Sequence, residues 1–234
     1  MAIPISATLT PTSSTLVITP KPFTPTTYAR YGTCVTSPLE SDLQSHPSDI
    51  PQPRYPEQMA PESANQRSAL KSPTISTLTN NYASSTSPST VRPSMSLFCS
   101  FPRKPTAAFP VTHIERHPYT SQTFVPTGLA NSEDTFYLVV SAPTLEGQVR
   151  DGIRNPPDLD RMEAFVARGD QAVTYAAGTW HSPMIVVGTR RVDFVVYQWV
   201  NGVVGDDCEL CQVGGEASVD LSKVTGGAKE KAKL

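Results

Sequence analysis

Two segments of this chain hold most of the side chains that could carry out small-molecule chemistry. The first segment contains Glu115, His117 and Gln122, and the second contains His181 three residues after Gly178. Imidazole, carboxylate and amide groups can transfer protons, bind a divalent cation or orient a polar substrate. A lone histidine after a turn is more often structural than catalytic, so the inference depends on the two segments meeting in the fold.

Strand parity sorts the residues of the first segment into two faces. Successive side chains of a β-strand point to opposite faces, so Glu115 and His117 share one face while Ile114 and Arg116 share the other. In the simpler alternative, the ionisable face is a solvated outer surface. A turn and then Gln122 follow at once, and this density of polar groups favours a lined pocket. Arg116 could clamp a carboxylate by its charge, but its parity directs it away from that pocket.

The composition of the chain limits the classes of protein to which it can belong. The sequence has 234 residues, 38% of them hydrophobic, with 23 prolines and a net charge of −2. The low hydrophobic content and the many prolines predict that part of the chain lies outside a packed core. Neither nucleic acid nor membrane is expected as a partner, because there is no clustered basic face and no apolar run long enough for a bilayer.

The cysteines and the two chain ends carry weaker signals. Cys208 and Cys211 form a lone CxxC without the second pair that structural zinc would need, so ordinary reduced thiols are expected. The N-terminus lacks the pattern of a secretory signal. The final tripeptide, Ala232-Lys233-Leu234, is a close variant of the Ser-Lys-Leu address read by the peroxisomal import receptor. It predicts a peroxisomal location, with the cytoplasm as the alternative.

Changes in composition divide the chain into four parts. We expect a flexible leader at residues 1–15, a single domain over 16–220 and a flexible charged tail at 221–234. Residues 68–95 are dominated by Ser, Thr, Asn and Pro. Such a segment buries too little apolar surface to offset its ordering entropy, so it is predicted to be a disordered insertion within the domain.

The rest of the chain indicates short strands and few helices. One helix is predicted after Thr24 as N-cap, with Gly32 closing it, and a second at 158–169 from the apolar spacing of Leu159, Met162, Phe165 and Val166. β-branched and aromatic runs between Pro and Gly residues predict strands at 16–18, 96–101, 111–117, 122–125, 135–141, 172–175, 184–187 and 192–199. This pattern favours a mostly β fold, a small antiparallel barrel of jelly-roll type with a few short helices.

The two chemical segments together resemble the paired motifs of cupin barrels. The first cupin motif ends His-x-His, four residues, Glu, and the second contains Gly-x-x-His; this chain has Glu115-x-His117, four residues, Gln122, and Gly178-Thr-Trp-His181. The resemblance implies that Glu115, His117, Gln122 and His181 surround the barrel centre. There they could hold a divalent ion such as nickel, manganese, iron or zinc. Gln122 replaces the usual Glu, which removes one anionic ligand and leaves metal binding open.

A longer set of motifs is similar, in order and spacing, to the ureidoglycolate lyase family, also called ureidoglycolate hydrolase. The resemblance covers residues 16–67 and 96–210. The low-complexity insertion between these ranges makes the organisation of the chain similar to that of the fungal members of the family. Asn65 falls in the family's Asn-Gln-Gly element, although Arg67 stands in place of its glycine. The matching motifs are Glu115 to Pro126, Phe136 to Ser141, Pro157-Asp-Leu, Phe165 to Gly169, Tyr175 to Pro183, Val192 to Val196 and Asp207-Cys-Glu209.

The resemblance implies a cupin-like homodimeric enzyme that cleaves (S)-ureidoglycolate to glyoxylate and urea in purine and allantoin catabolism. It implies His181 or Glu115 as the base, and His117 as a proton donor or metal ligand. It places Gln122 and Asn65 on the substrate, with Tyr175 and Trp180 as walls of the pocket. Three alternatives remain: another metal-dependent cupin enzyme, a non-catalytic cupin that binds a small ligand, and an amidohydrolase that releases ammonia from the same substrate.

Overall fold

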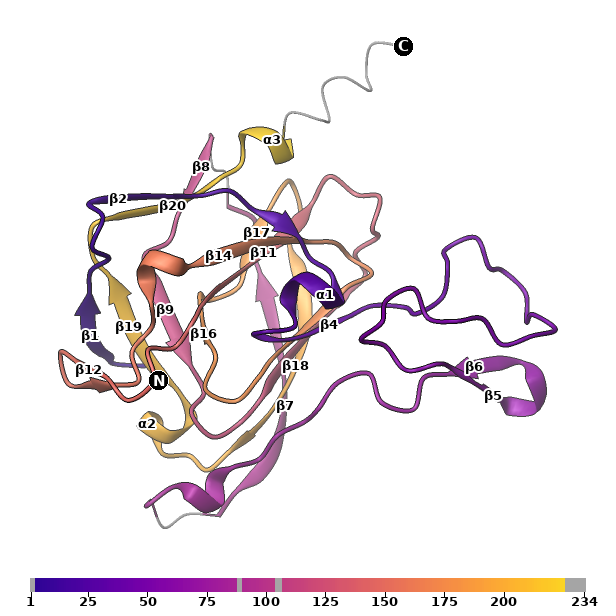
Figure 1. Ribbon diagram of the computed structural model, residues 1–234, viewed down its shortest axis with the longest axis horizontal. Coiled ribbons are helices and arrows are strands. Elements are labelled where there is room, and N and C mark those ends of the chain that lie inside the picture. The colour runs from indigo at the N-terminus through magenta and orange to yellow at the C-terminus, as the bar shows by residue number, and fades with distance from the viewer. Residues whose placement is uncertain (1–2, 88–89, 104–106, 226–234) are drawn as a thin grey trace.

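The computed structural model describes residues 3–87, 90–103 and 107–225. Within these residues strands predominate and the helices are short, and the strands form several sheets that are largely antiparallel. Figure 1 shows the main sheets wrapped into a barrel from which one long segment projects. The prediction of a mostly β, cupin-like fold with a few short helices is confirmed. No helix in the described part of the chain is long and apolar enough to cross a membrane.

The largest sheet has eight strands and carries one half of the candidate site. Its order is β1-β19-β9-β16-β11-β14-β3, with β17 also pairing with β11. Most pairs are antiparallel, while β1 with β19 and β3 with β14 are parallel. The strands are β1 (Ile5–Leu9), β3 (Lys21–Pro22), β9 (His113–Arg116), β11 (Phe136–Ala142), β14 (Glu163–Ala167), β16 (Trp180–His181), β17 (Ile185–Val187) and β19 (Glu209–Val213).

A five-stranded antiparallel sheet, in the order β4-β15-β10-β18-β7, carries the other half. Its strands are β4 (Gly32–Val35), β7 (Arg92–Ser100), β10 (Gln122–Thr127), β15 (Ala172–Tyr175) and β18 (Val192–Val200). The strands predicted around 96–101, 122–125, 172–175 and 192–199 are therefore all present. β7 begins at Arg92, so the last residues of the predicted insertion at 68–95 belong to this sheet.

Smaller elements complete the fold. A three-stranded sheet joins β2 (Thr15–Ile18), β20 (Glu216–Asp220) and β8 (Ala108–Pro110), and two hairpins join β5 (Glu62–Ala64) to β6 (Ala69–Lys71) and β12 (Val149–Arg150) to β13 (Ile153–Arg154). The helices are α1 (Pro25–Tyr28), α2 (Val204–Asp207) and α3 (Ser222–Thr225), with 3-10 turns η1 (Asn65–Arg67), η2 (Tyr82–Ser84) and η3 (Leu159–Arg161).

Two apolar cores lie on opposite faces of the eight-stranded sheet, which explains why β11 is buried along its whole length. The inner core lies against the five-stranded sheet and includes Tyr137, Val139, Phe165, Phe124 and Phe194. The outer core lies against the three-stranded sheet and includes Leu138, Val140, Ile114, Trp180 and Val219. Burial of both faces turns the expected alternation of a strand into a continuous apolar run.

The prediction of a helix at 158–169 is wrong. Only the 3-10 turn η3 forms there, and the strand β14 follows it. Leu159 and Met162 pack in the outer core while Phe165 packs in the inner core, so these side chains do not share one face. A short apolar run buried on both sides has the same periodicity as a helix segment, and periodicity alone cannot separate the two.

Two segments predicted to be flexible contain paired structure. β1 lies within residues 1–15 and pairs with β19, which buries Leu9. The predicted insertion at 68–95 contains β6 and η2 as well as the start of β7. Most of the predicted tail, including Ala232-Lys233-Leu234, lies outside the described residues. The division of the chain into domains remains a prediction.

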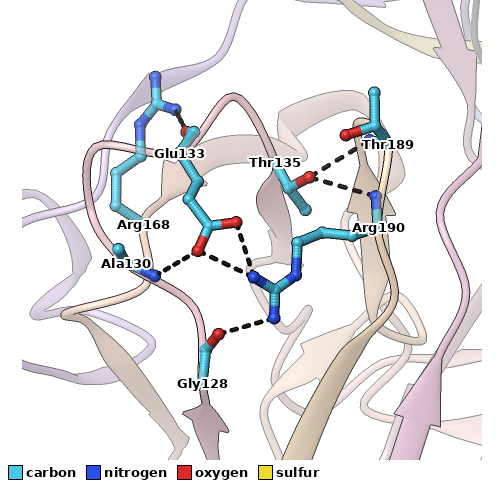
Figure 2. Close-up of polar contacts among 7 residues, drawn as sticks. All are labelled: Gly128, Ala130, Glu133, Thr135, Arg168, Thr189 and Arg190. Atoms are coloured by element: carbon cyan, nitrogen blue, oxygen red, sulfur yellow. Dashed lines mark hydrogen bonds and ion pairs between the residues drawn. The ribbon is translucent and has the colours of Figure 1, made fainter.

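A polar cluster lies at the end of β10 farthest from Gln122 (Figure 2). The Arg190 guanidinium donates to both Glu133 carboxylate oxygens, at 3.0 and 2.9 Å, and to the Gly128 carbonyl at 2.7 Å. The Ala130 backbone N–H and the Arg190 guanidinium lower the pKa of Glu133. Glu133 lies in the β10–β11 connection, at the opposite end of β10 from Gln122, so its replacement is a control remote from the candidate site.

The start of β4 requires glycine. Thr24 is the N-cap of α1, as predicted, and forms a capping box with Thr27. The helix ends at Tyr28, however, and Gly32 instead begins β4 opposite Tyr175. A Cβ on Gly32 would lie 2.0 Å from the Thr174 carbonyl oxygen, and its φ is +148°. We expect Gly32→Ala to lower the free energy of unfolding by about 3 kcal/mol, through overpacking and backbone strain. Urea denaturation measures this loss, and an unchanged midpoint would contradict it.

Candidate functional site

The structure brings together the two chemical segments identified in the sequence. β9 and β16 are antiparallel neighbours, and their single register pair joins Glu115 to His181. His117 follows β9 on the same face as Glu115. The ligand atoms of Glu115, His117 and His181 all lie within 4.8 Å of one another, and both imidazoles are buried. The pairing of the segments, on which the sequence argument depended, therefore exists.

Backbone carbonyls fix the orientation of both histidine rings. The Nδ1 atom of His117 lies 2.5 Å from the carbonyl oxygen of Asp207, and that of His181 lies 2.8 Å from the carbonyl oxygen of Thr179. A carbonyl only accepts, so each Nδ1 carries a proton, and in the neutral ring Nε2 is the nitrogen with the lone pair. Both Nε2 atoms are buried without a hydrogen-bond partner. Such orphaned acceptors need a ligand, because a buried unsatisfied polar group is costly.

Burial sets the charges of the cluster. Burial, with the nearby His117, lowers the pKa of His181 to about 3, so this imidazole is neutral at physiological pH. Burial also raises the pKa of the Glu115 carboxyl. The His181 Nε2 lies 3.7 Å from a Glu115 oxygen, but with a neutral ring this contact is not an ion pair. The cluster thus places the neutral imidazole of His181 beside a carboxyl group that is a stronger base than usual.

The cluster opens into a pocket between the two main sheets. Its wall includes Gln122 and Phe124 from β10, Gln198 from β18, and Cys208 after α2. The cavity is about 430 Å³, a size that suits a small polar molecule. Among the lining residues that the structure describes there is no Lys or Arg. An anionic ligand in this pocket would therefore need amide donors or a bound cation.

Two glutamine side chains form the polar wall of the pocket. Gln122 and Gln198 are register partners in β10 and β18, and the Gln122 amide donates to the Gln198 carbonyl at 2.6 Å. The Gln122 Oε1 atom is buried without a partner. Sequence reasoning found Gln122 and missed Gln198. Gln198 follows Phe194 and Val196 at alternate positions of one strand, so parity would place it on their face, but nothing local shows that β18 lies beside β10.

Cys208 is a second residue that the sequence did not assign to the site. Its thiol donates to the Glu115 Oε2 at 3.8 Å, a distance compatible with a sulfur donor. Burial raises the pKa of Cys208, so the group remains a thiol. The four cysteines are free, as expected, and Cys208 is the one that contacts the cluster. It can orient the carboxyl group without carrying charge itself.

Tyr175 and Trp180 support the site without forming its wall. The Tyr175 ring stacks on His181 at 3.7 Å between centroids, within the inner core, and holds the imidazole plane. Trp180 points to the opposite face, as parity requires for the neighbour of His181, and is buried in the outer core. Its indole N–H donates to the Asn155 carbonyl at 2.9 Å. The structure does not bring Trp180 to the pocket that the sequence predicted for it.

Asn65 lies far from the cluster, in an exposed turn between β5 and β6. Figure 1 shows this hairpin projecting from the barrel. Asn65, Gln66 and Arg67 all have positive φ, at 50°, 57° and 69°. Arg67, where glycine was expected, thus adopts the left-handed conformation that glycine favours. Within this chain the turn does not reach the pocket, so the predicted contact of Asn65 with substrate has no support here.

Arg116 has a structural role on the face opposite to Glu115. Its guanidinium pairs with Glu209 at 2.7 Å, donates to the carbonyls of Arg154 and Asn155, and stacks on Trp180 at 4.5 Å. We expect Arg116→Met to lower the free energy of unfolding by about 3 kcal/mol, because it leaves the part-buried Glu209 unpaired. Denaturation measures the loss of stability. A large rise in KM without that loss would instead indicate that Arg116 binds the carboxylate of the substrate.

Comparison with known proteins is consistent with this geometry. The family model described as ureidoglycolate lyase matches residues 15–220. A ureidoglycolate lyase of Schizosaccharomyces pombe is 37% identical over 153 residues, 63% of this chain and 75% of that protein. One from Saccharomyces cerevisiae is 44% identical over 84 residues (36% and 38%), and one from Burkholderia mallei 42% over 105 residues (45% and 51%). The chain belongs to the ureidoglycolate lyase family.

Proposed function

We propose that this protein is a lyase that cleaves (S)-ureidoglycolate to glyoxylate and urea, in purine and allantoin breakdown. The observation that carries the proposal is the convergence of Glu115, His117 and His181 in one cluster, two of whose members line the pocket, in a member of this family. The substrate carries a hydroxyl and a ureido nitrogen on one carbon, beside a carboxylate. Cleavage needs a base for the hydroxyl proton, an acid for the departing nitrogen and donors for the carboxylate.

Glu115 is the group best placed to move the proton. It accepts the hydroxyl proton as the carbon–nitrogen bond breaks and the carbonyl of glyoxylate forms, and it returns that proton to the departing ureido nitrogen as urea. Burial raises its pKa, which brings a carboxyl group closer to the value that proton transfer at neutral pH requires. The Cys208 thiol holds Oε2 in place. His181 stays neutral, so it does not supply the proton.

The amide pair orients the substrate. Gln122 and Gln198 line the same wall and are linked to each other, so together they present a fixed set of amide donors and acceptors. We assign them to the ureido and carboxylate groups of the substrate. Phe124, on the same wall, excludes water from one side of the pocket.

The residues of the cluster also fit a divalent metal ion. His117 and His181 offer unpartnered Nε2 atoms, Glu115 an oxygen and Gln122 an unpartnered carbonyl oxygen. Two imidazoles with oxygen donors suit nickel, manganese, iron or zinc. When bound, such an ion supplies positive charge that polarises oxygen atoms of the substrate and lowers the pKa of a hydroxyl. This charge would offset the lack of Lys and Arg among the described lining residues.

A product assay tests the proposed reaction. The purified protein is incubated with (S)-ureidoglycolate, and glyoxylate, urea and ammonia are measured against a protein-free blank, with and without a chelator. The proposal predicts glyoxylate and urea in equal amounts above the blank. Ammonia in place of urea would identify an amidohydrolase instead. Absence of turnover, with ligand binding retained, would favour a cupin that only binds a small molecule.

We also propose that the protein is a homodimer. The outer face of the five-stranded sheet supports this, because Leu97, Val195 and Val125 form one register row across β7, β18 and β10, with Leu97 59% exposed. Met95 lies near this row and is 74% exposed. An exposed apolar face of this kind is typical of an interface. Light scattering should give the mass of a dimer for the native protein and of a monomer for Leu97→Lys.

Finally, we propose delivery to the peroxisome by the import receptor. The support is the similarity of Ala232-Lys233-Leu234 to the Ser-Lys-Leu address. The protein fused behind a fluorescent protein should colocalise with a peroxisomal marker, and Leu234→Asp should release it to the cytoplasm. Uniform cytoplasmic signal from the native sequence would rule this location out.

A further inference from the structure

A segment that looks like low-complexity sequence packs directly behind the candidate site. Residues 79–82 run beside the turn that leads into β10: Asn81 donates its backbone N–H to the Tyr119 carbonyl at 2.7 Å, and Thr79 exchanges hydrogen bonds with Ser121. Tyr82 then enters the protein interior, where it is 5% exposed. The segment is thus attached to the barrel through both its backbone and one buried aromatic side chain.

The Tyr82 hydroxyl is aimed at α2. It lies 2.7 Å from the Asp207 Oδ1 atom and 3.1 Å from the Trp199 carbonyl oxygen. Burial and the Asp207 carboxylate raise the pKa of Tyr82 well above its ordinary value, so the phenol keeps its proton and donates it. The ring packs on Tyr119 with 5.6 Å between centroids. Its hydroxyl can therefore be removed without removing the packing.

Asp207 joins this segment to the cluster. Its carboxylate also accepts from the backbone N–H groups of Asn201 and Gly202, both at 2.8 Å, and its backbone carbonyl accepts the Nδ1 proton of His117 at 2.5 Å. The next residue, Cys208, contacts Glu115. The end of α2 and the residue after it consequently hold two of the three cluster residues, and Tyr82 donates to Asp207 from outside that loop.

We propose that Tyr82 is a positioning residue: through Asp207 it fixes the peptide carbonyl that sets the tautomer and ring orientation of His117. This inference rests on the proposed function, since it assigns Tyr82 to the same site. Without the hydroxyl, the Asp207 side chain keeps only its contacts within its own loop, and the carbonyl that faces His117 is free to tilt. Replacing a residue that orients a reacting or metal-binding side chain typically lowers affinity or activity by about 10–100-fold.

Ser85 provides a matched control. It lies in the same segment and donates to the Asp206 Oδ2 at 2.5 Å, one residue before Asp207 on the same helix. Asp206 has no hydrogen bond to the cluster among the described residues, whereas Asp207 has one. Tyr82→Phe and Ser85→Ala each remove one hydroxyl that donates to an aspartate of α2, but only Asp207 contacts His117, so only the first should alter His117.

The test measures His117 directly in the metal-free full-length protein. The proton NMR signal of the His117 Nδ1 proton is assigned by its absence in His117→Gln. The rate at which this proton exchanges with water is then measured, and ureidoglycolate cleavage is assayed in parallel. In Tyr82→Phe we expect exchange at least about tenfold faster and kcat about tenfold lower, with KM changed less. Ser85→Ala should stay within about twofold of the native protein on both measures.

Unchanged exchange of this proton in Tyr82→Phe would overturn the inference, whatever the activity does. If the native protein had no lyase activity, the proposed function would fail while the exchange measurement still decided the role of Tyr82. Should Tyr82→Phe prove unfolded by circular dichroism, Asp207→Asn tests the same link from its other end. It keeps the backbone carbonyl and weakens the acceptor, so the faster exchange is again expected, and its absence would overturn the inference.

Discussion

Glu115→Gln should lower kcat/KM for (S)-ureidoglycolate by about 10³-fold, or about 4 kcal/mol of transition-state stabilisation. The amide has the shape of the carboxyl group but cannot accept and return the hydroxyl proton. The same change should not lower the free energy of unfolding, because burial already disfavours the charged carboxylate, as its raised pKa shows. A loss of activity with stability retained separates a catalytic group from one that holds the fold together. Steady-state kinetics and urea denaturation on the same preparation give both quantities.

Glu133→Gln is the matched control for this experiment. It makes the same chemical change in the cluster of Figure 2, where Glu133 accepts from Arg190 and the Ala130 N–H, far from the pocket. Its kcat/KM should remain within about twofold of the native value. If Glu115→Gln retained more than a tenth of the native kcat/KM, Glu115 would not be the group that moves the proton.

His181→Gln should weaken the binding of Ni²⁺ to the purified metal-free protein by at least about 100-fold, since loss of a direct ligand should exceed the 10–100-fold effect of its supporting partners. The Nε2 atom of His181 is one of two buried imidazole nitrogens without a partner, and it faces Glu115 at 3.7 Å. Isothermal titration calorimetry measures the affinity. Lyase activity should fall in parallel if the ion serves the reaction.

His113→Gln controls for the general loss of a histidine. His113 lies on β9 with the same parity as Glu115 but contacts Thr112 outside the cluster, so its replacement should leave Ni²⁺ affinity unchanged. Equal affinity of the native protein and His181→Gln would show that the ion binds elsewhere or not at all. In that case the cluster would act through proton transfer and hydrogen bonding alone.

Local sequence was enough to predict the parts of this site that lie on one strand or beside one turn. Parity placed Glu115 and His117 together and Arg116 behind them, and the structure confirms both placements. The same rule, applied to β16, would have placed Trp180 opposite to His181. Strands were recognisable because β-branched and aromatic runs lie between Pro and Gly breaks, and β14 was mistaken for a helix because both of its faces are buried.

What sequence could not supply is the contact between distant strands and loops. Gln198 enters the pocket because β18 pairs with β10, and Cys208 reaches Glu115 because β19, which follows it, pairs with β9. Tyr82 sits in a stretch whose composition predicts disorder, yet one buried aromatic residue and a few backbone hydrogen bonds attach it to the barrel. Average composition does not reveal a single anchoring side chain.

The location of the reaction is the central claim, and a crystal structure of the protein with the product glyoxylate tests it most directly. We predict electron density for glyoxylate in the pocket between the two main sheets, within hydrogen-bond distance of Gln122 or Gln198 and beside Glu115, with any metal ion on His117 and His181. Glyoxylate bound at another place, such as the hollow between α1, β4 and residues 57–75, would contradict the account.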